Sequence, residues 1–342
     1  MKEKNHSNHF LLLSVILIVF FFINIRFGSV SIPFKDIFNI LFGGDISKDS
    51  WETIIINFRV PKAITAILVG SGLSVCGLLM QTLFRNPLAG PFVLGISYGA
   101  SLGVAILILG SSIFGGALLT NSLSNLSLPI AASFGAFLVL SSVILAANKV
   151  RNTMSILIIG LMFGSLTSAV ISVLAYFSEA AQIQQYLLWS FGSLGNLSWN
   201  ELIVLSCIYS VGIVGTIFVI KPLNSLLLGE SYAKSLGINI KKSRNIILLI
   251  TSLLTGVITA FSGPIAFVGL AVPHITKIIF SSSNHKILLP ATAIIGAIIL
   301  LICDSIAQLP TSDFILPINA ITSFFGAPVV IWLLVRKKKL YV

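Results

Sequence analysis

The chain has 342 residues, of which 56% are hydrophobic and 9% are charged, and its formal net charge is +11. Soluble domains carry about 25% charged residues, so this chain has too few to cover a water-facing surface. The composition excludes a soluble enzyme, a soluble nucleic-acid-binding protein and a disordered scaffold. It predicts an all-α polytopic membrane protein.

Apolar stretches long enough to cross a bilayer recur along the sequence. A transmembrane helix needs about 20 mostly apolar residues, and breaks at charges, prolines and glycine clusters separate about ten such stretches. The expected spans are residues 9–27, 60–84, 92–110, 127–147, 153–177, 199–220, 244–262, 265–281, 286–308 and 315–335. The first lacks a small-x-small cleavage site, so we expect an uncleaved helix. The third and eighth are short, and the break at Gly263 and Pro264 is the weakest.

The distribution of cations predicts the orientation. With a cytoplasmic N-terminus, 16 of the 21 lysines and arginines fall on the inner side. Those on the outer side are Arg26, Lys35, Lys48, Arg59 and Lys62. The positive-inside rule therefore predicts that both termini are cytoplasmic.

We expect one transmembrane domain over residues 1–342, with a long outer loop at 28–58 and a long inner loop at 221–243. Within the outer loop, Pro33–Phe42 alternates apolar and polar faces and is expected to lie along the membrane surface. The parity of ten spans also allows spans two to five and seven to ten to form an inverted repeat.

Arg59 and Lys62 flank a proline at the outer start of the second span, on the side that is otherwise poor in cations. They suit the docking of an acidic external partner through charge-assisted hydrogen bonds. The alternative is that both side chains snorkel to lipid phosphates.

Glycines at spacings of four follow an inner turn at Gln81–Gly90. Gly95, Gly99 and Gly103 lie in the third span, and Gly160 and Gly164 repeat the spacing in the fifth. Such small-residue faces allow close helix packing in lipid. A substrate route lined by these helices is the alternative interpretation.

The inner loop contains a short helical pattern between Gly229 and Gly237, on which Tyr232, Ala233 and Leu236 could share one face. Glu230 lies near the start of this segment, where a carboxylate suits the helix dipole. The helix could insert into a groove on a partner or rest on the membrane, and the pattern fits both equally.

Two ionisable residues lie within apolar runs. His274 follows Pro273 and is either a proton or metal site or, more commonly for such a residue, a hydrogen-bonding partner of freed backbone carbonyls. Asp304, followed one turn later by Gln308, is a functional hypothesis by default at membrane depth. It lies about one turn from the outer end of its span, where we expect a solvated position to be available.

The sequence has no G-x-x-x-x-G-K-[ST] motif, no H-E-x-x-H motif and no Cys/His cluster, so we expect no catalytic residues, no metal site and no ATP site on this chain. Acidic residues in the spans are also too few for the proton or sodium relay of a typical secondary transporter.

Taken in order, seven segments resemble one family closely, the FecCD-type permeases of bacterial type II ABC importers for iron siderophores, haem and cobalamin. The matching segments are Arg59–Lys62, Arg85–Ala89, Leu94–Ser101, Leu228–Gly237, Gly263–Gly269, Val272–His274 and Gly326–Pro328. The chain departs from the pattern at Gln308, where the family often has Arg, at Ile315, near which it has Glu, at Lys62, where Arg is frequent, and at Gly90, where Asp is common. A third outer basic contact is therefore not expected.

The resemblance implies roles for particular residues. Arg59 and Lys62 would face acidic residues of an extracytoplasmic substrate-binding protein. The cytoplasmic gate would be formed by Asn86, Leu88, Asn152 and Thr153. The ATPase coupling helix would include Leu228, Gly229, Glu230, Ala233, Ser235, Leu236 and Gly237.

The resemblance also implies an assembly. Two permease copies, expected to be a homodimer, would enclose a path lined largely by spans five and ten in the bacterial cytoplasmic (inner) membrane, surrounded by lipid. Two separate ATPase subunits would bind ATP and Mg, so this chain would hold no cofactor and no nucleic acid. The expected function is alternating-access import of a metal chelate (ferric siderophore or haem) or cobalamin. An inverted-repeat secondary transporter that does not depend on ATP is the alternative.

Overall fold

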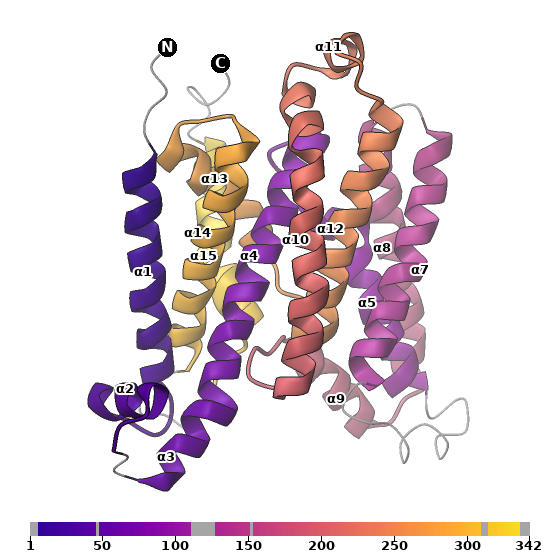
Figure 1. The fold of residues 1–342 in the computed structure, drawn as a ribbon. Coiled ribbons are helices and arrows are strands. Elements are labelled where there is room, and N and C mark those ends of the chain that lie inside the picture. Colours follow the sequence, from indigo (N-terminus) through magenta and orange to yellow (C-terminus); the bar gives the residue numbers. More distant parts are fainter. Residues whose placement is uncertain (1–5, 46–47, 111–126, 151–152, 309–313, 336–342) are drawn as a thin grey trace. The chain divides into compact units, whose positions relative to one another are not determined.

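The computed structural model describes residues 6–45, 48–110, 127–150, 153–308 and 314–335, and these residues are mostly helical (Figure 1). The helices of the first half are α1 (Ser7–Arg26), α2 (Phe34–Phe42), α3 (Asp49–Ile54), the π-helix η1 (Ile55–Arg59), α4 (Val60–Leu83), the 3-10 helix η2 (Pro91–Leu94), α5 (Ile96–Ile108), α7 (Ser127–Lys149) and α8 (Thr153–Tyr176). Those of the second half are α9 (Ala180–Ser190), α10 (Trp199–Leu227), α11 (Glu230–Ser235), α12 (Ile240–Ser262), α13 (Val268–Phe280), α14 (His285–Ala307) and α15 (Ile318–Val335).

The ten expected spans correspond to ten apolar helices of the described residues. Seven helical segments are long and apolar enough to cross a membrane, and three apolar helices are shorter. The short ones include α5 and α13, which are the third and eighth spans. The predicted fold class, an all-α membrane protein, is confirmed. The chain also breaks between Gly263 and Phe267, where the weakest boundary was expected.

The second span starts earlier than predicted, because α3, η1 and α4 form one helical run from Asp49 to Leu83. Pro61 has no backbone N–H and therefore leaves a carbonyl without its helical donor. In the π-register of η1, where the Val60 N–H donates to the Ile55 carbonyl, that carbonyl belongs to Ile56. It accepts a hydrogen bond of 3.1 Å from the Trp199 indole instead. The helix thus continues through the proline.

Helical structure also extends into the expected inner loop. α10 runs to Leu227 and contains Pro222, so residues 221–227 are helical rather than looped. Leu223 and Leu226, three residues apart on one face, are 0% and 3% exposed. Their burial holds the last turns of α10 in place despite the proline.

The described residues fall into two compact units, each with its own packing. Unit 1 comprises Met1–Val75, Ser193–Ile203 and Ala266–Val342, and in it α14 packs against α1, α13 and α15. Unit 2 comprises Cys76–Gly192 and Val204–Ile265, and in it α5 packs against α7, α8 and α12.

The same backbone feature occurs once in spans two to five and once in spans seven to ten, the two groups expected to form the inverted repeat. A residue with positive φ precedes each short span, namely Gly95 (φ 74°) before α5 and Phe267 (φ 66°) before α13. A Cβ on Gly95 would lie 2.9 Å from the carbonyl oxygen of Gly160 in α8, and a Cβ on Gly326 in α15 would overlap Phe267. In both repeats the start of the short second helix therefore lies against the fourth helix.

Candidate functional site

Arg59 ends η1 and is 9% exposed, although its position at a membrane boundary would allow solvation. Its guanidinium donates hydrogen bonds of 2.8 Å to the carbonyls of Ile25 and Arg26, and a short one to the carbonyl of Val30. Two of these acceptors are the last carbonyls of α1, where the helix dipole favours a cation. Arg59 therefore joins the end of α1 to the start of the second span.

Lys62 lies one turn further along and makes an ion pair. Its Nζ is 3.1 Å from Asp304 Oδ1, with side-chain exposures of 16% for Lys62 and 3% for Asp304. The Asn24 amide donates to Asp304 Oδ2 at 2.9 Å, and the Gln308 amide donates to the same oxygen at 2.8 Å. The expectation of a solvated position for Asp304 is wrong, because three donors compensate its burial.

This cluster of Asn24, Lys62, Asp304 and Gln308 connects α1, α4 and α14 within unit 1. The available signal for Asn24 was that it is the only amide residue of the first apolar run. The docking role of Arg59 and Lys62 stays a prediction. In this structure the cationic groups of both side chains already contact acceptors within the chain, Asp304 for Lys62 and backbone carbonyls for Arg59.

Two of the expected gate residues, Asn86 and Leu88, lie on the turn between α4 and η2. Asn86 Oδ1 accepts a hydrogen bond of 2.9 Å from the Leu88 N–H, which fixes the turn before Pro91. Leu88 is 39% exposed. The chain then enters η2, which packs against α8, the helix that starts at Thr153. Asn152 lies outside the described residues, so the gate stays a prediction.

The expected coupling helix is present as α11, and its C-terminus has a Schellman motif. The Gly237 N–H donates to the Lys234 carbonyl at 2.9 Å, and the Ile238 N–H donates to the Ala233 carbonyl at 3.0 Å. Gly237 takes the left-handed φ of 78° that this motif requires.

Tyr232, Ala233 and Leu236 were predicted to share one face, but in the structure Ala233 is buried while Tyr232 and Leu236 are exposed. Ala233 is fully buried, and α11 packs against α12. Leu228, Tyr232 and Leu236 are 63%, 51% and 51% exposed. Tyr232 and Leu236 are four residues apart and so share an exposed side of α11, whereas Leu228 lies in the turn before Gly229. Glu230 and Ser235 are the first and last residues of the helix, and Gly229 (φ 107°) precedes it.

The spaced glycines lie at helix crossings inside unit 2. A Cβ on Gly99 would lie 2.6 Å from the Gly135 carbonyl oxygen, and one on Gly103 would overlap the Ala131 carbonyl. A Cβ on Gly164 would lie 2.9 Å from the ring of Tyr98. These positions place α5 close to α7 and α8.

One helix that bears on this region was not predicted. Glu179 caps α9 through a capping box with Gln182, and the Glu-x-x-Gln spacing was the available signal. α9 packs against α5, where the side chains of Tyr186 and Ser101 are hydrogen-bonded. Burial raises the pKa of Tyr186 above its ordinary value, so the phenol is protonated at neutral pH.

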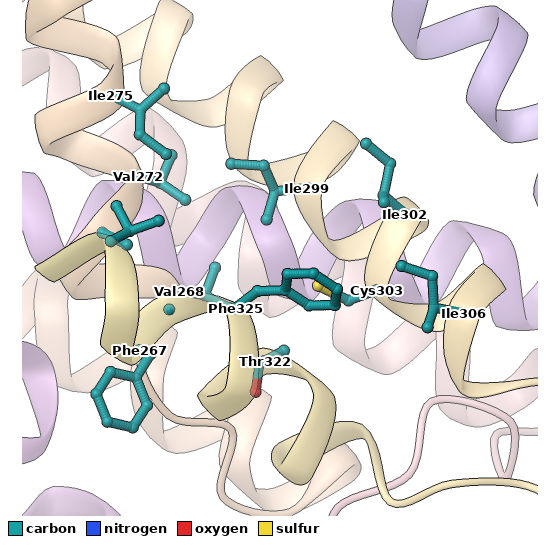
Figure 2. Close-up of a pocket in the computed structure, with 13 residues that line it drawn as sticks. Phe267, Val268, Val272, Ile275, Ile299, Ile302, Cys303, Ile306, Thr322 and Phe325 are labelled. Carbon is teal, nitrogen blue, oxygen red and sulfur yellow. The ribbon is translucent and has the colours of Figure 1, made fainter. Parts of the chain in front are cut away.

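Unit 1 contains an apolar cavity of about 220 Å³ between α13, α14 and α15 (Figure 2). Its lining includes Phe267, Ile302 and Phe325. The Thr322 hydroxyl, which also lines it, donates to the Asn319 carbonyl at 3.1 Å. Ligand sites combine apolar walls with a few converging polar groups, so this cavity is a packing feature rather than a site for a metal chelate. Among the described residues, no group of three His, Cys, Asp or Glu side chains could hold a metal ion.

Comparison with known proteins shows which family the chain belongs to. The family described as the FecCD transport family matches residues 16–336. The chain belongs to this family. It is 33% identical to the hemin transport system permease protein HmuU of Yersinia pestis, over 96% of this chain and 95% of that protein. It is 35% identical to the vitamin B12 import system permease protein BtuC of Klebsiella pneumoniae, over 84% of both chains.

A solved structure supports the same fold. An inward-facing ABC transporter assigned to the metal-chelate type matches with a TM-score of 0.83 and 28% identity, covering 97% of this chain and all of the other. This FecCD-family chain therefore has the fold of a type II ABC importer permease, and the resemblance found in the sequence is confirmed.

Proposed function

We propose that this chain is the transmembrane permease subunit of an ATP-driven importer for a metal chelate (ferric siderophore or haem) or cobalamin. The names of its relatives, a hemin transport permease and a vitamin B12 import permease, support this cargo class. The substrate would cross the bacterial cytoplasmic membrane between two copies of the permease. An extracytoplasmic binding protein would deliver it.

The geometry of α11 carries the proposal. The helix ends in a Schellman motif, buries Ala233 and exposes Tyr232 and Leu236, and Leu228 is exposed in the turn before it. Exposed apolar side chains on a short helix suit insertion into a groove on a partner protein. We assign that partner to the ATPase, whose closure on ATP would move α11. α12, packed against α11, would transmit the motion.

Exposed apolar faces support a second copy. On α8, Ile158, Leu161, Met162 and Leu166 are 49–60% exposed and recur at helical spacing. On α15, Phe324 is 74% exposed and Phe325 is 44% exposed. These are the fifth and tenth spans, which the family resemblance implies line the path between two copies. A homodimer would cover them while leaving a wide, weakly charged path for a bulky chelate.

Uptake of labelled ferric siderophore, haem and cobalamin tests the proposal. Cells with and without this chain are compared, each with an active or an inactive ATPase subunit. We expect uptake of one cargo to need both proteins. Uptake that needs this chain, survives ATPase loss and collapses with an ionophore would instead establish the secondary transporter.

Gly237→Pro tests the role of α11 directly. Proline cannot adopt a φ of +78° and removes the N–H that bonds Lys234, so the helix end should unwind. Gly43→Pro is the matched control, because Gly43 has a φ of +81° and ends α2 with an N–H bonded to Asn39. We expect only the Gly237 variant to lose ATP-driven uptake while remaining inserted. Equal loss in both variants would reject a specific coupling role for α11.

A further inference from the structure

An open groove is lined by the second half of α1 and by α2 in unit 1. Its volume is about 790 Å³, and its walls include Ile18, Val19 and Phe22 of α1 together with Phe34 and Phe38 of α2. The Phe22 and Phe38 rings stack with their centroids 4.8 Å apart at 27°. Apart from one cation, Arg26, the wall is apolar.

The two helices give the groove a lipid-facing character. The apolar part of α1 is only 17% buried in the structure, and Ile18 and Val19 are 57% and 48% exposed. α2 buries Ile37 and Ile40 and leaves Phe34, Phe38 and Phe42 exposed at intervals of four. The groove is therefore continuous with the apolar surface that α1 shows to the bilayer, and α2 lies across the end of α1 (Figure 1). Its exposed aromatic stripe suits the membrane interface.

Arg26 gives the groove its charge. It is the last residue of α1, and its guanidinium lies 4.5 Å from the centroid of the Phe34 ring. This cation–π contact holds the side chain at the groove. Among the described side chains, no carboxylate forms a salt bridge with Arg26, in contrast to Lys62 and its partner Asp304. A planar guanidinium matches the two oxygens of a phosphate.

We propose that this groove binds one anionic phospholipid, with an acyl chain against Val19 and Phe38 and the phosphate on Arg26. The apolar wall and the single exposed cation at its membrane-boundary end are complementary to the two parts of such a lipid. The bound lipid fills the space between α1 and α2 and so holds α2 against the span.

Native mass spectrometry of the purified full-length chain tests the proposal. The chain is loaded with phosphatidylglycerol or phosphatidylcholine of matched acyl chains and then stripped by detergent exchange. Both lipids carry a phosphate, but the choline cation of phosphatidylcholine offsets its charge. We therefore expect one phosphatidylglycerol to be retained in preference to phosphatidylcholine, by about tenfold. Equal retention of both lipids by the unmodified chain would overturn the proposal without any variant.

Four variants locate the site. Arg26→Gln should lose the preference for phosphatidylglycerol, whereas Arg26→Lys, which keeps the charge but not the planar guanidinium, should retain part of it. Lys35→Gln removes an exposed cation next to Phe34 that does not line the groove, and should change nothing. Val19→Trp should narrow the groove where the acyl chain lies and reduce retention of both lipids. A preference that persists in Arg26→Gln, or retention unchanged in Val19→Trp, would contradict the assignment.

Discussion

Lys62 on α4 and Asp304 on α14 form an ion pair with Nζ and Oδ1 3.1 Å apart, and the aspartate is almost fully enclosed. Two charges removed from water cost free energy that their attraction offsets only if further hydrogen bonds are made. Here the amides of Asn24 and Gln308 supply those bonds. The arrangement makes the ends of α1, α4 and α14 depend on one another.

A double-mutant cycle should show that dependence. Breaking a fully buried pair costs about 3–5 kcal/mol, and we expect less here because Lys62 keeps 16% side-chain exposure. Lys62→Gln and Asp304→Asn should each lower the thermal unfolding midpoint in detergent. The double variant, a neutral pair of similar shape, should recover part of the loss. Strictly additive losses would show that the two groups do not interact.

The same neutral pair tests docking of the substrate-binding protein. Lys62→Gln/Asp304→Asn leaves the net charge unchanged, so any loss of affinity reports local contacts rather than the general field. If Lys62 contacts acidic residues of the binding protein, affinity should fall at low salt and depend less on salt. Lys35→Gln serves as the comparison, since it removes a cation elsewhere on the expected outer side. Affinity equal to that of the unmodified chain would reject the docking role of Lys62.

Arg59 is expected to stabilise the fold. Its guanidinium reaches three carbonyls of residues 25–30, which the single ammonium of lysine cannot match in geometry. We therefore expect Arg59→Lys to lower the thermal midpoint although the charge is kept. Lys62→Arg, which also keeps its charge, is the control and should have a smaller effect. An unchanged midpoint in Arg59→Lys would show that the carbonyl contacts are dispensable.

The close approach of α5 and α7 predicts that an added methyl group lowers the thermal midpoint at the helix crossing but not elsewhere. A Cβ on Gly103 would overlap the Ala131 carbonyl, whereas one on Gly90 meets nothing within 4 Å. Gly103→Ala should therefore force α5 and α7 apart and lower the thermal midpoint, while Gly90→Ala should not. Overpacking of this kind costs about 1–3 kcal/mol. Equal midpoints for the two variants would contradict the close crossing.

The spans and α11 could be predicted because their signals are local. Apolar length gave the ten spans, and the pair Gly229 and Gly237 bounded the short helix that the structure contains. The fully buried Ala233 shows the limit of that reasoning, because its neighbour α12 determines which face of α11 is covered.

Features that depend on distant residues could not be predicted in this way. Asn24 and Asp304 are 280 residues apart in the sequence, so the burial of the aspartate had no local signal. The helical run through Pro61 depends on Trp199, which is 143 residues from the carbonyl that it satisfies. α9 is different, since its Glu-x-x-Gln capping box was present in the sequence and could have been used.

The backbone conformation of Arg85 lowers the stability of the chain, whereas its side chain makes a contact next to α11. It ends α4 in a Schellman motif, with the Arg85 N–H bonded to the Thr82 carbonyl and the Asn86 N–H bonded to the Gln81 carbonyl. Its φ of 48° is left-handed, a conformation that glycine adopts with less strain. Its side chain lies beside the start of α11, since a Cβ on Gly229 would be 3.7 Å from Arg85 Nη1.

Arg85→Gly should therefore stabilise the chain and impair transport. Relief of the left-handed strain should contribute about 1 kcal/mol, measured as a higher thermal midpoint. Loss of the guanidinium next to Gly229 should reduce ATP-driven uptake if the end of α4 and α11 move together. Ser281→Gly is the matched control, because Ser281 has a φ of 47° at the end of α13. It should gain the same stability with uptake unchanged. Full uptake by Arg85→Gly would show that the contact with the turn before α11 has no part in coupling.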